Sequence, residues 1–188
     1  MGVGPLKAVF LDRDGVLNRV IVRDGKPYPP ASLAELEILP DVPEALAALK
    51  KHGFLLLVVT NQPDVARGKQ RRVVVESMHA ALKSVLPIDD FFVCYHDDAD
   101  ACDCRKPKPG LLLQAVDKYK LELNTCYLIG DRWRDIEAGQ VAGCATAWID
   151  RNYAERGPSN PSTVRVTSCG EAVRWILEGR SLEDNDPL

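Results

Sequence analysis

A short apolar run near the N-terminus ends in two carboxylates and a glycine, and this feature most constrains the fold. Residues 9–16 read Val-Phe-Leu-Asp-Arg-Asp-Gly-Val. The apolar part predicts a buried strand, and buried carboxylates are costly unless a partner such as a metal compensates them. Asp12 and Asp14 therefore indicate a hard-cation site where a strand opens into a loop, which is where parallel α/β sheets bind ligands. Taken alone, the pair is equally compatible with two solvated aspartates in a turn.

The length and composition are those of one soluble domain. The 188 residues are 46% hydrophobic and 27% charged with a formal net charge of −3, which leaves no broad basic field for nucleic acid. No apolar run is long enough to cross a membrane, and no signal peptide precedes the first strand, so we expect a cytoplasmic protein. We assign residues 1–180 to a single domain and residues 181–188 to a frayed, acidic C-terminal tail. A monomer is expected.

Strands and helices alternate along the chain. The apolar patterns predict strands over residues 7–11, 54–59, 90–95, 125–129, 144–149 and 164–166. Helices are predicted from Asp41, as N-cap, to Gly53, and over residues 70–86, 109–120, 132–142 and 171–177, while residues 18–30 form a loop or a small hairpin flap. This order predicts an α/β fold: a three-layer, doubly wound Rossmannoid with a mostly parallel sheet.

Polar groups stand where the apolar strand patterns stop, and parallel strands share one carboxyl edge. Carboxylates that follow strands suit Mg²⁺, which binds few carboxylates plus water and substrate phosphate. A hydroxyl and an ammonium can hold phosphate oxygens. One aspartate can act as a nucleophile that forms an aspartyl-phosphate, and a second can act as general acid and base. The residues that we expect to meet at this edge are Asp12, Asp14, Thr60, Asn61, Lys106 and Asp131.

At these residues the sequence resembles the haloacid dehalogenase-like superfamily of phosphatases. The four superfamily motifs correspond to Asp12-Arg13-Asp14-Gly15, to Thr60, to Lys106 and to Gly130-Asp131-Arg132-Trp133-Arg134-Asp135. The resemblance implies that Asp12 is the nucleophile and Asp14 the general acid and base. It also implies that Asp12, the backbone carbonyl of Asp14 and Asp131 hold Mg²⁺, while Asp135 orients the site. Lys108 is a rival for the lysine role, and Lys106 is preferred because it directly follows Arg105 and the cysteine-rich loop.

Three cysteines and one histidine gather in that loop: Cys94, His96, Cys102 and Cys104. Cytoplasmic thiols stay reduced, so the cluster indicates metal binding rather than a disulfide. A Cys₃His set is a usual closed structural zinc site. We predict a structural Zn²⁺ that folds this loop, and nearby aspartates would favour a cation. The alternative is three incidental cysteines beside a surface histidine.

The cysteine loop and the following Arg105-Lys106-Pro107 resemble one subgroup of the superfamily, which contains D-glycero-D-manno-heptose 1,7-bisphosphate phosphatases and histidinol-phosphate phosphatase domains. The resemblance implies a capless Mg²⁺-dependent phosphatase acting on a small phosphorylated metabolite. The C7 phosphate of the heptose bisphosphate is the first choice of substrate, and histidinol phosphate is the second. Arg105 would face the phosphate, and Asn61 and Arg67 would lie at or near the substrate. The sequence departs from the heptose enzymes at Pro63-Asp64 and in the flap at residues 23–28.

Two other functions compete with a phosphatase. A phosphotransferase or mutase of the superfamily usually has a cap that excludes water, and the intervals 14–60 and 60–106 leave no room for one. A non-catalytic zinc module would not need Asp12, Asp14 and Lys106, which are all present. Two further side chains receive structural interpretations: His79 on a helix surface and Trp133 in the core rather than at the site edge.

Overall fold

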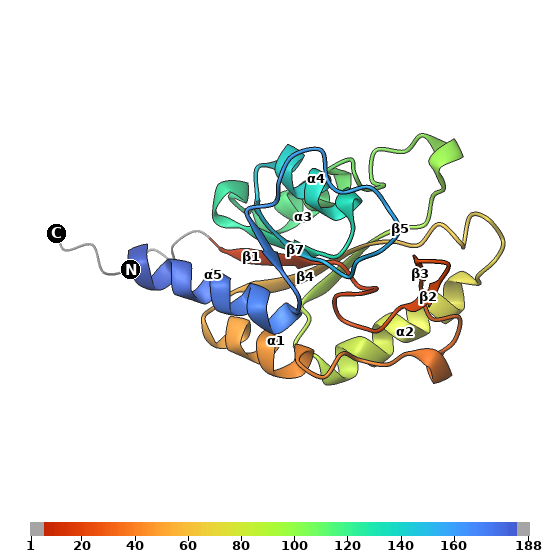
Figure 1. Ribbon diagram of the computed structural model, residues 1–188, viewed down its shortest axis with the longest axis horizontal. Coiled ribbons are helices and arrows are strands. Elements are labelled where there is room, and N and C mark those ends of the chain that lie inside the picture. Colours follow the sequence, from red (N-terminus) through yellow and green to blue (C-terminus); the bar gives the residue numbers. More distant parts are fainter. Residues whose placement is uncertain (1–5, 184–188) are drawn as a thin grey trace.

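The computed structural model describes residues 6–183 as a six-stranded sheet with helices on both faces (Figure 1). The strand order is β5-β4-β1-β6-β7-β8, and every neighbouring pair is parallel. The predicted three-layer, doubly wound fold is confirmed. The strands are β1 (Ala8–Leu11), β4 (Leu55–Asn61), β5 (Asp90–Cys94), β6 (Tyr127–Gly130), β7 (Ala145–Ile149) and β8 (Val164–Val166).

The helices form the two outer layers. In Figure 1, α1 (Val42–Lys51), α2 (Arg72–Val85) and α5 (Cys169–Glu183) lie below the sheet, and α3 (Gly110–Tyr119) and α4 (Trp133–Ala142) lie above it. Three short 3₁₀ turns, η1 (Leu33–Glu35), η2 (Asp98–Asp100) and η3 (Leu123–Thr125), interrupt the loops. Both faces of the sheet are therefore covered, as an all-parallel sheet requires.

The central strand β1 shows why its sequence is apolar at every position. Alternate side chains of a strand point to opposite faces. Val9 and Leu11 join the core between the sheet and the layer of α1 and α5, whereas Ala8 and Phe10 join the core between the sheet and the layer of α3 and α4. All four are fully buried. A strand buried on both faces needs no polar residue until it ends, so Asp12 marks the carboxyl edge.

Helix α5 is longer than the sequence predicted, and it changes the role of Asp41. The helix continues to Glu183, past the expected end at residue 177, and residues 184–188 of the expected tail lie outside the described part. Asp41 makes no side-chain cap for α1. Its Oδ2 instead accepts a hydrogen bond from the backbone N–H of Gly170 at 2.8 Å. The carboxylate therefore caps the last helix rather than the first, and it ties the start of α1 to the start of α5.

A short hairpin is the one element between β1 and η1, and it forms the predicted flap. Strands β2 (Ile21–Arg23) and β3 (Lys26–Tyr28) pair in antiparallel fashion. Between β4 and α3 the chain forms only α2, β5 and the cysteine-rich loop with η2. The fully described intervals 14–60 and 60–106 thus contain no cap domain.

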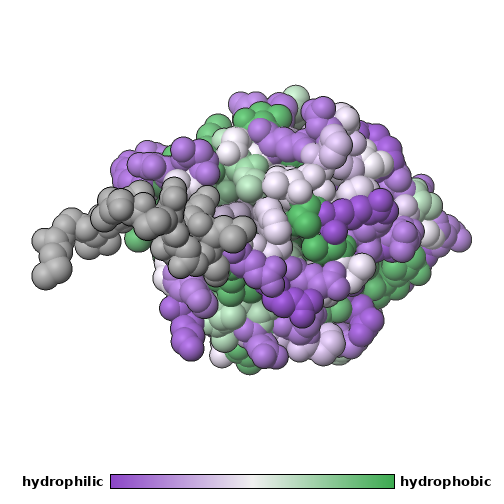
Figure 2. All heavy atoms as spheres, turned by 60° about the vertical axis from the view of Figure 1, so that its left-hand side comes forward, coloured by the Kyte–Doolittle hydropathy of each residue, from purple (hydrophilic) through white to green (hydrophobic). Residues whose placement is uncertain are grey.

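The surface carries its large apolar side chains singly. The most exposed are Val141 on α4, Val73 and Val85 at opposite ends of α2, and Val22 on β2. The face seen in Figure 2 is correspondingly mixed, with hydrophilic residues beside small apolar areas. Isolated exposed hydrophobic residues are ordinary on folded proteins. Within residues 6–183, no helix combines the length and the apolar character needed to cross a bilayer.

Two helical glycines provide a matched test of how closely α4 packs on the sheet. A Cβ at Gly139 would lie 2.7 Å from Thr146 Cγ2 and 3.2 Å from Leu128 Cβ, whereas nothing lies within 4 Å of a Cβ at Gly179. Gly139→Ala should therefore lower the free energy of unfolding by about 1–3 kcal/mol through overpacking. Gly179→Ala should raise it by about 0.5–1 kcal/mol because alanine favours a helix. Urea denaturation of both variants measures the difference, and equal effects would contradict the packing described here.

Candidate active site

Three buried carboxylates meet at the carboxyl edge of the sheet. Asp12 follows β1, Asp131 follows β6, and Asp135 lies in the first turn of α4. Each is less than a tenth exposed, and one oxygen from each lies within 4.8 Å of the others. The strand order reverses between β1 and β6, and open α/β sheets bind ligands at such a point. We call these three residues the carboxylate cluster.

A single buried ammonium group balances part of this charge. Lys106 Nζ lies 2.7 Å from Asp12 Oδ1 and 2.6 Å from Asp135 Oδ1, and it also donates to the Val59 carbonyl at 2.6 Å. Asn61 holds the lysine backbone on both sides, since its amide donates to the Lys106 carbonyl and accepts from the Lys106 N–H. Asn61 thereby acts on the lysine as well as lining the cleft. The rival Lys108 is exposed and donates to the Cys102 carbonyl.

The cluster carries more negative charge than Lys106 can offset. Burial raises the pKa of Asp12 to about 6, Lys106 opposes that rise, and Asp135 adds to it. Burial, with Asp12 and Asp135 nearby, raises the pKa of Asp131 well above its ordinary value. Burial alone would lower the pKa of Lys106, but the attraction of Asp12 and Asp135 raises it, so the lysine stays charged. The excess charge favours binding of a cation.

The second aspartate of the first motif lies in a separate set of hydrogen bonds. Both oxygens of Asp14 accept from the Arg13 guanidinium at 2.8–3.2 Å, and they also accept from Asn18 and Gln62. Gln62 donates to Thr60 Oγ1 at 3.0 Å as well, which places the buried Thr60 hydroxyl beneath it. Burial would raise the pKa of Asp14, but Arg13 and these hydrogen bonds lower it.

A cleft of about 570 Å³ opens above Asp12, Asp14, Lys106 and Asp135. One wall is the flap from Arg23 to Pro29, and another is the stretch from Asn61 to Asp64 with Arg67 and Lys69. Arg132 and Arg134 line the far side. Arg67 pairs with Asp64 and Asp97 at the rim. Arg105 lies behind the lining against Asp98, at 2.8 Å, and its Nη1 is buried without a hydrogen-bond partner in the described part.

The four predicted zinc ligands converge on one point. Cys94 Sγ lies 3.7 Å from both His96 Nδ1 and Cys102 Sγ. Cys104 Sγ lies 3.3 Å from His96 Nδ1 and 3.5 Å from Cys102 Sγ. A tetrahedral Zn²⁺ with ordinary bond lengths separates its sulfur and nitrogen ligands by about 3.6–3.8 Å. The spacing of the four atoms therefore fits a closed zinc site.

Aspartates of the same loop face the cleft arginines rather than the cysteine cluster. Asp98 lies within 4.0 Å of nitrogen atoms of Arg67, Arg105 and Arg134. Asp97 pairs with Arg67 and Asp103 pairs with Lys108. These carboxylates are thus paired with basic side chains of the protein, and Asp97 and Asp98 hold the cleft arginines in place.

Comparison with known proteins identifies the family. The family described as haloacid dehalogenase-like hydrolase matches residues 19–143. The chain belongs to this hydrolase family. The matched range includes Thr60, Lys106 and Asp131, and it begins after Asp12 and Asp14.

Relatives of the hydrolase include the D-glycero-beta-D-manno-heptose-1,7-bisphosphate 7-phosphatases of Pseudomonas aeruginosa and Escherichia coli strain K12. The first is 37% identical over 158 residues, which cover 81% of the chain and 86% of the relative. The second is 36% identical over 182 residues, which cover 90% of the chain and 87% of the relative. The predicted superfamily and the predicted enzyme class, a phosphoric monoester hydrolase, are confirmed.

Among solved structures, the hydrolase is similar to D,D-heptose 1,7-bisphosphate phosphatase from B. bronchiseptica, complexed with magnesium and phosphate. The TM-score is 0.80 at 28% identity, and the match covers 93% of the chain and 99% of that structure. A second heptose bisphosphate phosphatase, from Burkholderia thailandensis, has a TM-score of 0.62 at 24% identity. This match covers 93% of the chain and 99% of that structure, and it supports the fold alone.

The carboxylates of the hydrolase fit a magnesium ion. Asp131 Oδ1 is buried and has no hydrogen-bond partner within the described residues, and it lies in the cluster with Asp12 and Asp135. Mg²⁺ is commonly held by one or two carboxylates together with water and substrate phosphate. Asp135 already accepts from Lys106 through Oδ1 and from the Arg132 N–H through Oδ2. Asp12 and Asp131 are therefore the better candidate ligands, and Asp135 is suited to orienting Lys106.

The interpretation of His79 as a surface residue of the hydrolase is wrong. Its side chain is buried, stacks on Phe91 with ring centroids 4.7 Å apart, and lies 3.1 Å from Arg13 Nη1 through Nε2. Burial, and then the Arg13 charge, lower the pKa of His79 to about 4, so the ring is neutral and can accept from Arg13. A signal was available, because His79 shares the buried face of α2 with Val75, Met78 and Leu82.

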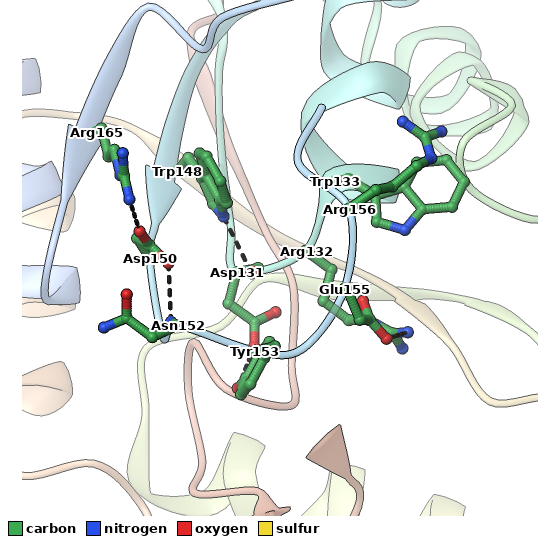
Figure 3. A pocket seen from close by; sticks show the side chains of 10 residues that line it. All are labelled: Asp131, Arg132, Trp133, Trp148, Asp150, Asn152, Tyr153, Glu155, Arg156 and Arg165. Carbon is green, nitrogen blue, oxygen red and sulfur yellow. Dashed lines mark hydrogen bonds and ion pairs between the residues drawn. The ribbon is translucent and has the colours of Figure 1, made fainter. Parts of the chain in front are cut away.

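Trp133 lies at the edge of the site rather than in the core. Its half-buried indole is flanked by the guanidinium groups of Arg134 and Arg156, at 4.5 and 3.4 Å from the ring centroid. It lines a smaller pocket of about 270 Å³ that Asp131 and Arg132 also line (Figure 3). Its sequence neighbours Arg132 and Arg134 form ion pairs with Glu155 and Asp98 respectively.

The segment after β7 supplies functional contacts that sequence reasoning missed. Arg151 donates to the Gly15 carbonyl at 3.0 and 3.2 Å, and the Tyr153 hydroxyl donates to Asp131 Oδ2 at 2.7 Å. Glu155 pairs with Arg132, which lines the cleft. The one available signal was topological, because this segment leaves the same carboxyl edge of the sheet as Asp12 and Asp131.

Binding of Mg²⁺ to the hydrolase should weaken at low pH. The pKa of Asp12 in the metal-free protein is about 6, so below this pH the cation must displace a proton. Because the pKa of Asp131 is raised as well, the apparent Kd is then expected to rise by at least about tenfold for each pH unit below that value. Calorimetric titration with MgCl₂ across this pH range measures the effect, and a Kd independent of pH would contradict the shift.

Proposed function

We propose that this protein is a Mg²⁺-dependent phosphatase that hydrolyses a phosphate monoester of a small metabolite through an aspartyl-phosphate. One observation carries the proposal: Asp12, in contact with Lys106 and clustered with Asp131, lies on the floor of an open cleft, and Asp14 lines the same cleft. Phosphoryl transfer needs mostly positioning and neutralisation of charge. This set of side chains supplies both.

In the proposed first step, an oxygen of Asp12 attacks phosphorus and the bond to the leaving oxygen breaks. Asp14 gives a proton to that oxygen. The anionic phosphate beside Asp14 raises its pKa and so favours its protonation before transfer. In the second step, Asp14 takes a proton from water, which attacks the aspartyl-phosphate and releases Asp12. Arg13 and the hydrogen bonds that lower the pKa of Asp14 favour its ionised form, which is the form that the second step needs.

The remaining groups hold charge in place. Lys106, Thr60 and Arg105 are proposed to hold the phosphate, and Asn61 and Arg67 are proposed to lie at the substrate. Asn61 serves the site chiefly by fixing the Lys106 backbone. When bound, Mg²⁺ neutralises the carboxylates and the transferring phosphate. The proposed ligands are Asp12, the backbone carbonyl of Asp14, and Asp131, with Asp135 orienting Lys106.

The relatives make D-glycero-D-manno-heptose 1,7-bisphosphate, cleaved at the C7 phosphate, the proposed substrate. The cleft lining supports a doubly phosphorylated sugar, since it carries Arg23, Lys26 and Lys69, none of which forms an ion pair with an acidic side chain within residues 6–183. Histidinol phosphate is the alternative, because the flap residues that line the cleft depart from the heptose enzymes. We further propose a structural Zn²⁺ at Cys94, His96, Cys102 and Cys104, in one domain acting as a cytoplasmic monomer without nucleic acid.

The substrate proposal predicts a strong preference within a panel of phosphate esters. We expect kcat/KM for one anomer of heptose 1,7-bisphosphate to exceed that for histidinol phosphate and simple sugar phosphates by at least about a hundredfold. Phosphate release with Mg²⁺ measures each rate, and Asp12→Asn is the inactive control. Weak and even activity on the whole panel would refute the substrate while leaving the chemistry. Activity that survives Asp12→Asn would refute the mechanism.

The two lysines of the loop give a matched test of charge stabilisation. Lys106→Met should lower kcat/KM by about 10²–10³, because it removes a preorganised cation from the position where charge develops. Lys108→Met should change kcat/KM by less than about threefold, as expected for an exposed side chain. Steady-state kinetics with saturating Mg²⁺ compares them, and a reversed order would assign the phosphate-holding role to Lys108.

A further inference from the structure

The segment from Arg151 to Glu155 lies along the carboxylate cluster with alternate side chains turned inward. Arg151, Tyr153 and Glu155 are half-buried, whereas Asn152 and Ala154 are exposed. Figure 3 shows Tyr153 directed at Asp131 from the loop that follows β7. The three inward side chains contact three different parts of the site: the Gly15 carbonyl, the Asp131 carboxylate and the Arg132 guanidinium.

The contact between Tyr153 and Asp131 leaves the two carboxylate oxygens in different states. The tyrosine hydroxyl donates to Oδ2 at 2.7 Å, while Oδ1 is buried without a partner within the described residues. A hydrogen bond from a neutral donor to a carboxylate favours the ionised form and fixes its orientation. The bare Oδ1 therefore points in a direction that the tyrosine determines.

Neighbouring contacts hold the tyrosine itself. Arg151 donates to the Gly15 carbonyl through Nε and Nη2, and the Ala154 N–H donates to the Gly25 carbonyl at the flap tip at 2.8 Å. Gly15 makes room for the pair, since a Cβ there would lie 1.8 Å from Asp131 Oδ2 and 3.0 Å from the Tyr153 hydroxyl. The glycine of the first motif is thus needed for this approach as well as for its φ of +87°.

We infer that Tyr153 is a positioning residue that presents Asp131 Oδ1 to the catalytic cation. The inference rests on the proposed function, because it assumes that the carboxylate cluster binds Mg²⁺. Groups that orient a metal ligand from outside the coordination sphere typically change metal affinity by about 10–100-fold when they are removed. Tyr153 touches neither the reacting phosphate nor the cation in this scheme, and it acts through Asp131.

The test is Mg²⁺ binding to the full-length protein without substrate. Tyr153→Phe removes only the hydroxyl, and it should raise the Kd for MgCl₂ by at least about tenfold in calorimetric titration. Tyr119→Phe is the matched control, because it removes a comparable hydrogen bond, to Asp90 at 3.1 Å, on an element remote from the cluster. Its Kd should equal that of the wild type. The kcat of Tyr153→Phe should recover as Mg²⁺ is raised, whereas a general structural defect would not be relieved in this way.

The outcomes separate this inference from the proposed function. Equal Mg²⁺ affinity in the wild type and Tyr153→Phe would overturn the inference and leave the phosphatase proposal intact. Absence of Mg²⁺ binding by the wild type would overturn the proposed function, and the inference with it. A fall in the metal-free melting temperature that accounts for the loss of activity, with an unchanged Kd, would also overturn the positioning role.

Discussion

The site depends on one electrostatic constraint: three buried carboxylates share a single buried ammonium group. Buried charge is costly unless it is paired, and Lys106 can reach only two of the three carboxylates closely. The fold supports this excess charge with rigid strand ends and a lysine whose backbone is held by Asn61. The remaining negative charge is suited to a divalent cation. Binding and stability are therefore linked, since a ligand that binds only the folded state stabilises it.

The cleft also places two neighbouring aspartates in surroundings of different charge. The two aspartates of the first motif lie two residues apart in sequence but have opposite environments. Burial, and then the neighbouring carboxylates, raise the pKa of Asp12, whereas Arg13, Asn18 and Gln62 outweigh burial and lower the pKa of Asp14. Arg13 is fully buried, and the neutral His79 ring accepts one of its hydrogen bonds. Arg13 contacts Asp14 and His79 contacts Arg13, and these two successive contacts make Asp14 chemically distinct from Asp12.

The sheet and the floor of the site could be predicted because each group directly follows an apolar run. Asp12, Thr60 and Asp131 stand where a strand pattern stops, and parallel strands bring their carboxyl ends together. Tyr153 could not be found in this way. Its partner Asp131 follows β6, more than twenty residues earlier, and no local pattern distinguishes Tyr153 from an ordinary loop tyrosine. The errors at Asp41 and Trp133 have the same cause, since Gly170 and Arg156 are partners supplied by distant segments.

The strand order also determines when the site can form during synthesis. The central strand β1 is made first, but β6, its neighbour on one side, follows more than a hundred residues later, and it carries the Ile129 carbonyl that the Asp12 N–H contacts. Gly170, the partner of Asp41, is synthesised later still. A chain emerging from the ribosome would hold Asp12 and Asp14 on an incomplete sheet until α4 and α5 arrive. Asp12 is thus the first part of the site to be synthesised and among the last to be enclosed, because contacts of high sequence separation form late.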